Sequence, residues 1–81
     1  MYENVFDSLR ELLIEEELIE KDTLLQSDSK LKVIFPEMDS LEFLEFAMIV
    51  EDKYDINIEN VHSILTYGNL VEVICTKLKE K

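Results

Sequence analysis

The chain has 81 residues and a formal net charge of −11, from 19 acidic and 8 basic side chains. This length supports one small domain over residues 1–81, and 47% hydrophobic residues are too many for a disordered chain. The negative surface excludes nucleic acid and anionic membrane as expected partners and favours a basic protein partner, although solubility alone would also explain such a charge.

Few residues are suited to cross-links or metal binding. Cys75 is the only cysteine and His62 the only histidine, so no internal disulfide can form and a zinc site is not expected. The first residues lack the basic start and apolar run of a signal peptide, and no apolar stretch approaches membrane-spanning length. We therefore expect a cytoplasmic protein in which Cys75 is a packing residue.

The first predicted helix runs from Tyr2 to about Ile19, with Asn4 as its N-cap. Apolar residues recur in it with helical spacing, at Val5, Leu9, Leu12 and Leu13. Three consecutive glutamates, at residues 15–17, crowd its C-terminal end. Because carboxylates oppose the helix dipole there, we expect this end to fray.

A long loop is predicted next, over residues 20–38. Its "LKVIF" stretch has the β-branched content of a short strand, but no second strand is predicted to pair with it. We therefore expect an ordered loop, held to the core by Leu24, Leu31, Val33 and Phe35. Loops of this length within small domains are uncommon and often functional.

The second main helix is predicted from Ser40 to Lys53, with Asp39 as its N-cap. At the helical repeat, one side is apolar and is expected to face the core, through Phe43, Phe46, Ala47, Val50 and Tyr54. The other side is acidic with two apolar neighbours, and consists of Glu42, Glu45, Asp52, Leu41 and Met48.

The rest of the chain predicts one or two helical turns over residues 60–64 and a last helix capped by Thr66. The apolar stripe of the last helix consists of Leu70, Val71, Ile74 and Leu78. Lysines at positions 77, 79 and 81 complement its C-terminal dipole. The predicted fold is all-α: a small four-helix bundle, of three main helices plus one short helix, with a long first loop.

No catalytic residue is expected. A serine nucleophile needs a nearby base, and His62 has no evident third residue to orient it. A calcium loop or a phosphate-binding glycine loop would need glycines that this chain, with Gly68 alone, does not contain. Ser40 is then either an ordinary residue of a first helical turn or an attachment point, where free helix N–H groups would favour an anion such as a phosphodiester.

Two stretches of the sequence resemble a known family. "MDSLEFLEFAMIVEDKY", from Met38, resembles the attachment motif and second helix of acyl carrier proteins, which bind phosphopantetheine. "TYGNLVEVI", from Thr66, resembles the start of the last helix of that family. The order and length of the other segments also agree, so the resemblance covers essentially the whole chain. It implies a non-catalytic, monomeric carrier of acyl thioesters in fatty acid, polyketide or other thiotemplated biosynthesis.

The resemblance also implies roles for particular residues. Ser40 matches the serine that receives 4′-phosphopantetheine from coenzyme A, and Asp39 matches the aspartate recognised by the phosphopantetheinyl transferase and its magnesium. Basic docking patches on acyl-loading and acyl-processing enzymes would meet Leu41, Glu42, Glu45, Met48, Glu51 and Asp52. The core or acyl pocket would be lined by Phe43, Phe46, Ala47 and Val50. No metal site is implied in the chain itself.

Three departures from the family pattern leave alternatives open. Glu37 stands where the family commonly has glycine, the link between the second and third helices is short, and Phe43 and Phe46 are bulkier than is usual in this helix. These departures leave open a specialised carrier of aminoacyl or aryl groups. A carrier-like interaction protein without a prosthetic group is a second alternative. A small acidic inhibitor that mimics nucleic acid is a third.

Overall fold

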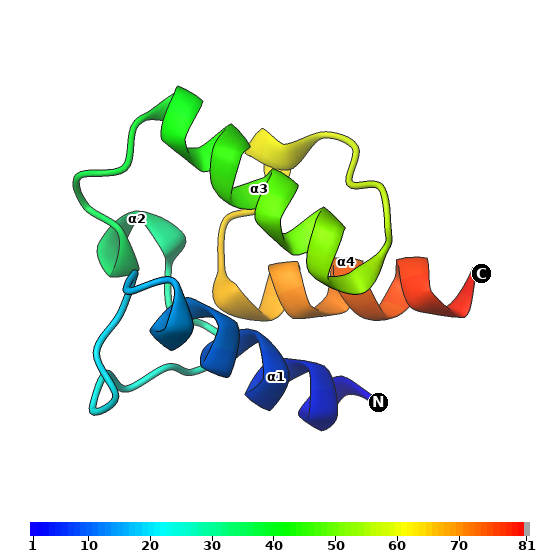
Figure 1. Ribbon diagram of the computed structural model, residues 1–81, viewed down its shortest axis with the longest axis horizontal. Helices are drawn as coiled ribbons and strands as arrows, with labels where there is room; N and C mark the ends of the chain where they lie inside the picture. Colours follow the sequence, from blue (N-terminus) through cyan, green and yellow to red (C-terminus); the bar gives the residue numbers. More distant parts are fainter. Residues whose placement is uncertain (81) are drawn as a thin grey trace.

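The computed structural model describes residues 1–80, in which every regular element is a helix or a helical turn (Figure 1). The elements in chain order are α1 (Tyr2–Glu15), α2 (Leu31–Ile34), α3 (Ser40–Tyr54), the 3-10 turn η1 (Val61–Ser63) and α4 (Tyr67–Lys79). The described residues form no strand, only an isolated backbone bridge between Lys30 and Thr66. The predicted small helical bundle is confirmed, while Lys81, which was expected to complement the dipole of the last helix, lies outside the described residues.

Helices α1 and α4 run antiparallel, side by side, and bring the two chain ends to one end of the molecule (Figure 1). Helix α1 buries all four residues of its predicted stripe, whereas α4 buries Leu70, Val71 and Ile74 but leaves Leu78 only partly buried. Leu9, Val71 and Ile74 are completely shielded from solvent. Helix α3 crosses the pair and contributes Phe46, Ala47 and Val50 to the core. Cys75 is buried in α4, as expected of a packing residue.

Tyr67 joins α4 to α1 at the centre of the core. Its side chain is fully buried, and its hydroxyl donates a hydrogen bond to the backbone carbonyl of Phe6. The Phe6 ring meets the Tyr67 ring edge-on, with centroids 4.6 Å apart. Burial raises the pKa of the Tyr67 phenol well above its ordinary value, because the anion would lose its hydration.

Hydrogen bonds hold the first loop, residues 16–30, to both α1 and α4. The Arg10 guanidinium donates hydrogen bonds from α1 to the carbonyls of Lys21 and Thr23. At the start of α4, the N–H of Gly68 donates to the carbonyl of Ser27 at 2.8 Å. A Cβ atom at position 68 would lie 2.6 Å from that oxygen, so only glycine permits the loop to approach this closely.

Helix α1 differs from its prediction at both ends. It ends at Glu15 rather than near Ile19, and Glu17 adopts the left-handed conformation, with φ of 59°. The glutamate run therefore lies where the helix stops, and backbone hydrogen bonds close this end, from the N–H groups of Glu17 and Leu18 to the carbonyls of Ile14 and Leu13. Asn4 is not the N-cap, because the helix already begins at Tyr2 and Asn4 lies within its first turn.

The stretch predicted as irregular loop contains the one-turn helix α2, which covers four residues. Leu31 and Phe35 are buried as expected, but Leu24 and Val33 are 77% and 73% exposed. Neither exposed residue anchors the loop; Leu25, which is 7% exposed, enters the core instead. A single helical turn presents only part of its circumference to the core, so Val33 points outward while Leu31 and Phe35 point inward. No helix in the described part of the chain is long and apolar enough to cross a membrane.

Candidate functional site

Ser40 is the first residue of α3, and its local geometry is set by the capping box predicted in part from the sequence. Asp39 is the N-cap, in extended backbone conformation, and its Oδ1 accepts the N–H of Glu42 at 2.8 Å. The Glu42 carboxylate accepts in turn from the N–H of Asp39 at 3.4 Å. This reciprocal pair fixes where the helix begins and leaves Ser40 exposed on its first turn.

The start of α3 presents free backbone N–H donors beside the Ser40 hydroxyl. The first N–H groups of a helix have no partner within the helix, and the dipole adds partial positive charge there. Asp39 uses the N–H of Glu42, while within residues 1–80 the N–H groups of Ser40 and Leu41 have no acceptor. A phosphodiester on the Ser40 oxygen would therefore lie beside free donors at a 15-residue helix.

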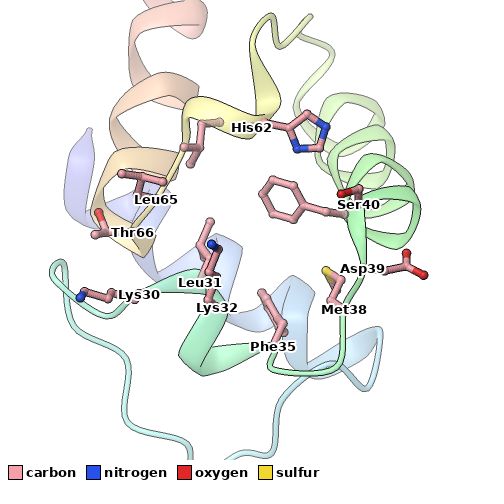
Figure 2. A pocket seen from close by; sticks show the side chains of 12 residues that line it. Lys30, Leu31, Lys32, Phe35, Met38, Asp39, Ser40, His62, Leu65 and Thr66 are labelled. Carbon is pink, nitrogen blue, oxygen red and sulfur yellow. The ribbon is translucent and has the colours of Figure 1, made fainter.

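A cavity of about 460 Å³ opens directly beside Ser40 (Figure 2). Three segments that are distant in the sequence form it: residues 30–35 around α2, the start of α3, and residues 62–66 between η1 and α4. The N–H of Leu31 donates to the carbonyl of Leu65 at 2.9 Å, which holds the first and third segments together. The cavity wall is formed by Lys30, Leu31, Lys32, Phe35, Met38, Asp39, Ser40, Phe43, His62, Ile64, Leu65 and Thr66.

Phe35 and Phe43 line this cavity and pack against Phe46 in the core. Phe46 is buried, and its ring centroid lies 5.6 Å from that of Phe35 and 6.0 Å from that of Phe43. Phe43 is half-buried and faces the cavity, with the exposed His62 ring 6.2 Å away on η1. Of the four positions expected to face the core or the acyl pocket, Phe43 therefore lines the cavity, whereas Phe46, Ala47 and Val50 lie in the core.

The residues predicted for docking lie along α3, outside the cavity. Leu41 and Met48 are 65% and 64% exposed, and the side chains expected beside them are also exposed, at Glu42, Glu45 and Asp52. Glu51 differs from this group because it is half-buried, and its Oε2 accepts the N–H of Ile58 at 2.7 Å. Its carboxylate therefore holds the segment after α3 in place, whether or not it also meets a partner.

Several site residues were missed from the sequence. Leu44 is 41% exposed and belongs to the same apolar edge, which its three- and four-residue spacing from Leu41 and Met48 could have indicated. Lys30, Lys32 and Leu65 also line the cavity, although no sequence pattern marked them as site residues. No local pattern indicates that Leu65 would meet Leu31, because that pairing depends on how the chain returns from η1 to α4.

One curated relative resembles nearly the whole chain. The protein named acyl carrier protein in Streptococcus thermophilus (strain CNRZ 1066) is 32% identical over 77 residues, which are 93% of this chain and 97% of the relative. No protein-family model matches the sequence. No solved structure matches it either.

Proposed function

Because this chain belongs to the acyl carrier protein family, we propose that it carries acyl groups as thioesters on a 4′-phosphopantetheine arm attached to Ser40. The observation that carries the proposal is the position of the Ser40 hydroxyl, exposed at the first residue of α3 and at the mouth of a cavity. The family-like Asp39–Ser40–Leu41 sequence at that position supports the same residue.

Attachment would be a phosphoryl-group transfer from coenzyme A. The Ser40 oxygen attacks the phosphorus that bears the pantetheine, a new P–O bond forms, and the pyrophosphate bond to adenosine 3′,5′-bisphosphate breaks. The hydroxyl proton passes to a base of the phosphopantetheinyl transferase. Asp39 uses Oδ1 for its cap bond, so Oδ2 is the oxygen that would meet the magnesium of the transferase.

The chain itself performs no catalysis in this proposal. The attached arm supplies a thiol on which the acyl group is held as a thioester. The helix start stabilises the anionic linkage, and the cavity shelters what the arm carries. The acidic and apolar outer side of α3 would meet basic patches on acyl-loading and acyl-processing enzymes in fatty acid, polyketide or other thiotemplated biosynthesis.

The proposal is tested by intact-mass measurement on the apo protein after incubation with coenzyme A, magnesium and a broad-specificity transferase. We expect one phosphopantetheine on the wild type and none on Ser40→Ala. Ser63→Ala is the matched control, because Ser63 is also exposed but lies on η1, and it should be loaded like the wild type. Unmodified wild type with several transferases, or loading of Ser40→Ala, would contradict the proposal. Circular dichroism verifies that the variants are folded.

A further inference from the structure

Two adjoining segments of this acidic protein carry no acidic residue. Residues 29–36 and 60–66 contain no aspartate or glutamate, although the chain has 19 of them, and the first segment carries two lysines. The N–H of Leu31 donates to the carbonyl of Leu65 at 2.9 Å and so holds the two segments together. We call their outer surface the acid-free face; its exposed side chains include Lys30, Lys32, Val33 and Leu65.

The lysines of the acid-free face are not used by the fold. Both are exposed, and within residues 1–80 neither forms an ion pair. Other cations of the protein do have partners in the chain: Arg10 donates to carbonyls of the first loop, and Lys77 pairs with Glu59. The ammonium groups of Lys30 and Lys32 are therefore available to an anionic group from outside the chain.

The acid-free face also exposes apolar side chains. Val33 is 73% exposed and Leu65 is 61% exposed. In the single turn of α2, Leu31 is buried, whereas Lys32 and Val33 lie on the outward side. Burial of these apolar side chains against a partner would be favourable, because it removes them from water. Lysines beside exposed apolar residues are complementary to a surface on which carboxylates surround an apolar group.

We propose that the acid-free face is a second docking surface, which binds a protein partner through carboxylates arranged around an apolar side chain. Its charge is opposite to that of the outer side of α3, where Glu42 and Glu45 are exposed. The two surfaces therefore fit different patches on a partner, one acidic and one basic. The inference goes beyond the proposed function, because docking at the acid-free face requires no arm on Ser40.

Both surfaces adjoin Ser40. This serine is the first residue of α3, and Figure 2 shows Lys30, Lys32 and Leu65 across the opening from it. A partner that contacts both surfaces is held in one orientation, because turning it around would bring like charges together. An enzyme with a uniformly basic docking surface is repelled by the two lysines, since like charges across an interface are costly. The acid-free face therefore selects among partners and orients them relative to Ser40.

The test uses two synthetic amphipathic peptides of opposite charge as stand-ins for the two kinds of patch. One consists of leucine and glutamate, and in the other every glutamate is replaced by lysine. Each is titrated into the isotope-labelled protein without the arm, and amide chemical shifts locate the binding. We expect the acidic peptide to move the signals of Lys32, Val33 and Leu65, and the basic peptide to move those of Glu42 and Glu45.

Two double variants remove the same amount of charge at different places. Lys30→Gln with Lys32→Gln should weaken binding of the acidic peptide roughly two- to tenfold, the range expected for two exposed charge pairs, and less at high salt. Lys53→Gln with Lys79→Gln should leave it unchanged, because those exposed lysines lie in the last turns of α3 and α4. Circular dichroism verifies that both variants are folded.

The possible outcomes each decide the matter. Acidic-peptide shifts that are absent, that spread over the whole protein, or that survive equally in both double variants would overturn the proposal. Equimolar phosphatidylglycerol and phosphatidylcholine vesicles are the comparison: if they bind with the same dependence on Lys30 and Lys32 and the acidic peptide does not, the face serves a lipid surface and the proposal is wrong. If the acidic peptide fails while Ser40 is still loaded by the transferase, only this docking surface is wrong. If Ser40 is not loaded, the proposed function is wrong, and the peptide result still decides this one.

Discussion

The two ends of this molecule use apolar residues in opposite ways. Between α1 and α4, Leu9, Val71 and Ile74 have no exposed surface. Around the start of α3, Leu41 and Leu65 are 65% and 61% exposed, and Met48, farther along the same helix, is 64% exposed. The first group excludes water and stabilises the fold, whereas the second leaves apolar surface available for a cargo or a partner. The hydrophobic content of the sequence therefore divides into a stabilising part and an interacting part.

Truncating one leucine at each end should reveal this division most strongly. Leu9→Ala removes side-chain atoms from a fully buried position and should lower the free energy of unfolding by about 2–5 kcal/mol. Leu65→Ala makes the same chemical change at a 61% exposed position, and should change it by no more than about 0.5 kcal/mol. Urea unfolding followed by circular dichroism measures both. Equal losses would show that the Ser40 end stabilises the fold as much as the α1–α4 interior.

Tyr67→Phe tests the polar link within the stabilising end. The substitution removes the hydroxyl that donates to the Phe6 carbonyl and should lower the free energy of unfolding by about 1–3 kcal/mol, as expected for a buried group left without its partner. An unchanged free energy of unfolding would mean that solvent replaces this bond without loss.

The same variant has a pH signature with a definite sign. Burial raises the pKa of Tyr67 above its ordinary value of 10.0, so the unfolded chain loses this proton more readily than the native protein. Below pH 10.0, the protonated Tyr67 makes its full contribution to the free energy of unfolding of the wild type. This contribution is lost as the pH rises above 10.0. Burial also raises the pKa of Tyr54, so Tyr67→Phe should flatten the alkaline loss without abolishing it. Unfolding measured across the alkaline range in both proteins tests this; identical slopes would contradict it.

The sequence predicted the elements whose signals are local. The three main helices follow from apolar spacing over several turns, and Asp39 and Thr66 were predicted as caps because each precedes an apolar stripe. The buried side of α3 follows from the same spacing. For the same reason, the exposed positions of Leu41 and Met48 agree with their prediction.

The parts that could not be predicted depend on contacts between distant segments. Nothing in the adjacent pair Leu24–Leu25 indicates that only the second residue is buried. Helix α2 has four residues, too few for an apolar period to be recognised. The cavity beside Ser40 exists because the chain after η1 returns to pair with Leu31, and that return has no signature in either segment alone.

Substitutions on the outer side of α3 should have the smallest effect on stability and act on a partner instead. Glu45 and Met48 are both exposed, so Glu45→Lys and Met48→Ala should change the free energy of unfolding by no more than about 0.5 kcal/mol. If this side docks on a basic patch, Glu45→Lys should slow association with the transferase and flatten its salt dependence. Met48→Ala should speed dissociation, at a cost of roughly 1–2 kcal/mol if the side chain is buried in the complex.

Glu11→Lys is the matched control for the charge reversal, because Glu11 is equally an exposed glutamate but lies on α1. It changes the net charge by the same amount, so any general loss of attraction to a basic partner appears in it as well. A larger loss of association rate in Glu45→Lys than in Glu11→Lys therefore reports the position and not the charge alone. Surface plasmon resonance with the transferase gives both rate constants, and circular dichroism verifies the helices. If Glu45→Lys and Glu11→Lys behave alike and Met48→Ala dissociates like the wild type, the outer side of α3 does not contact the transferase, and its exposed apolar residues serve another partner or none.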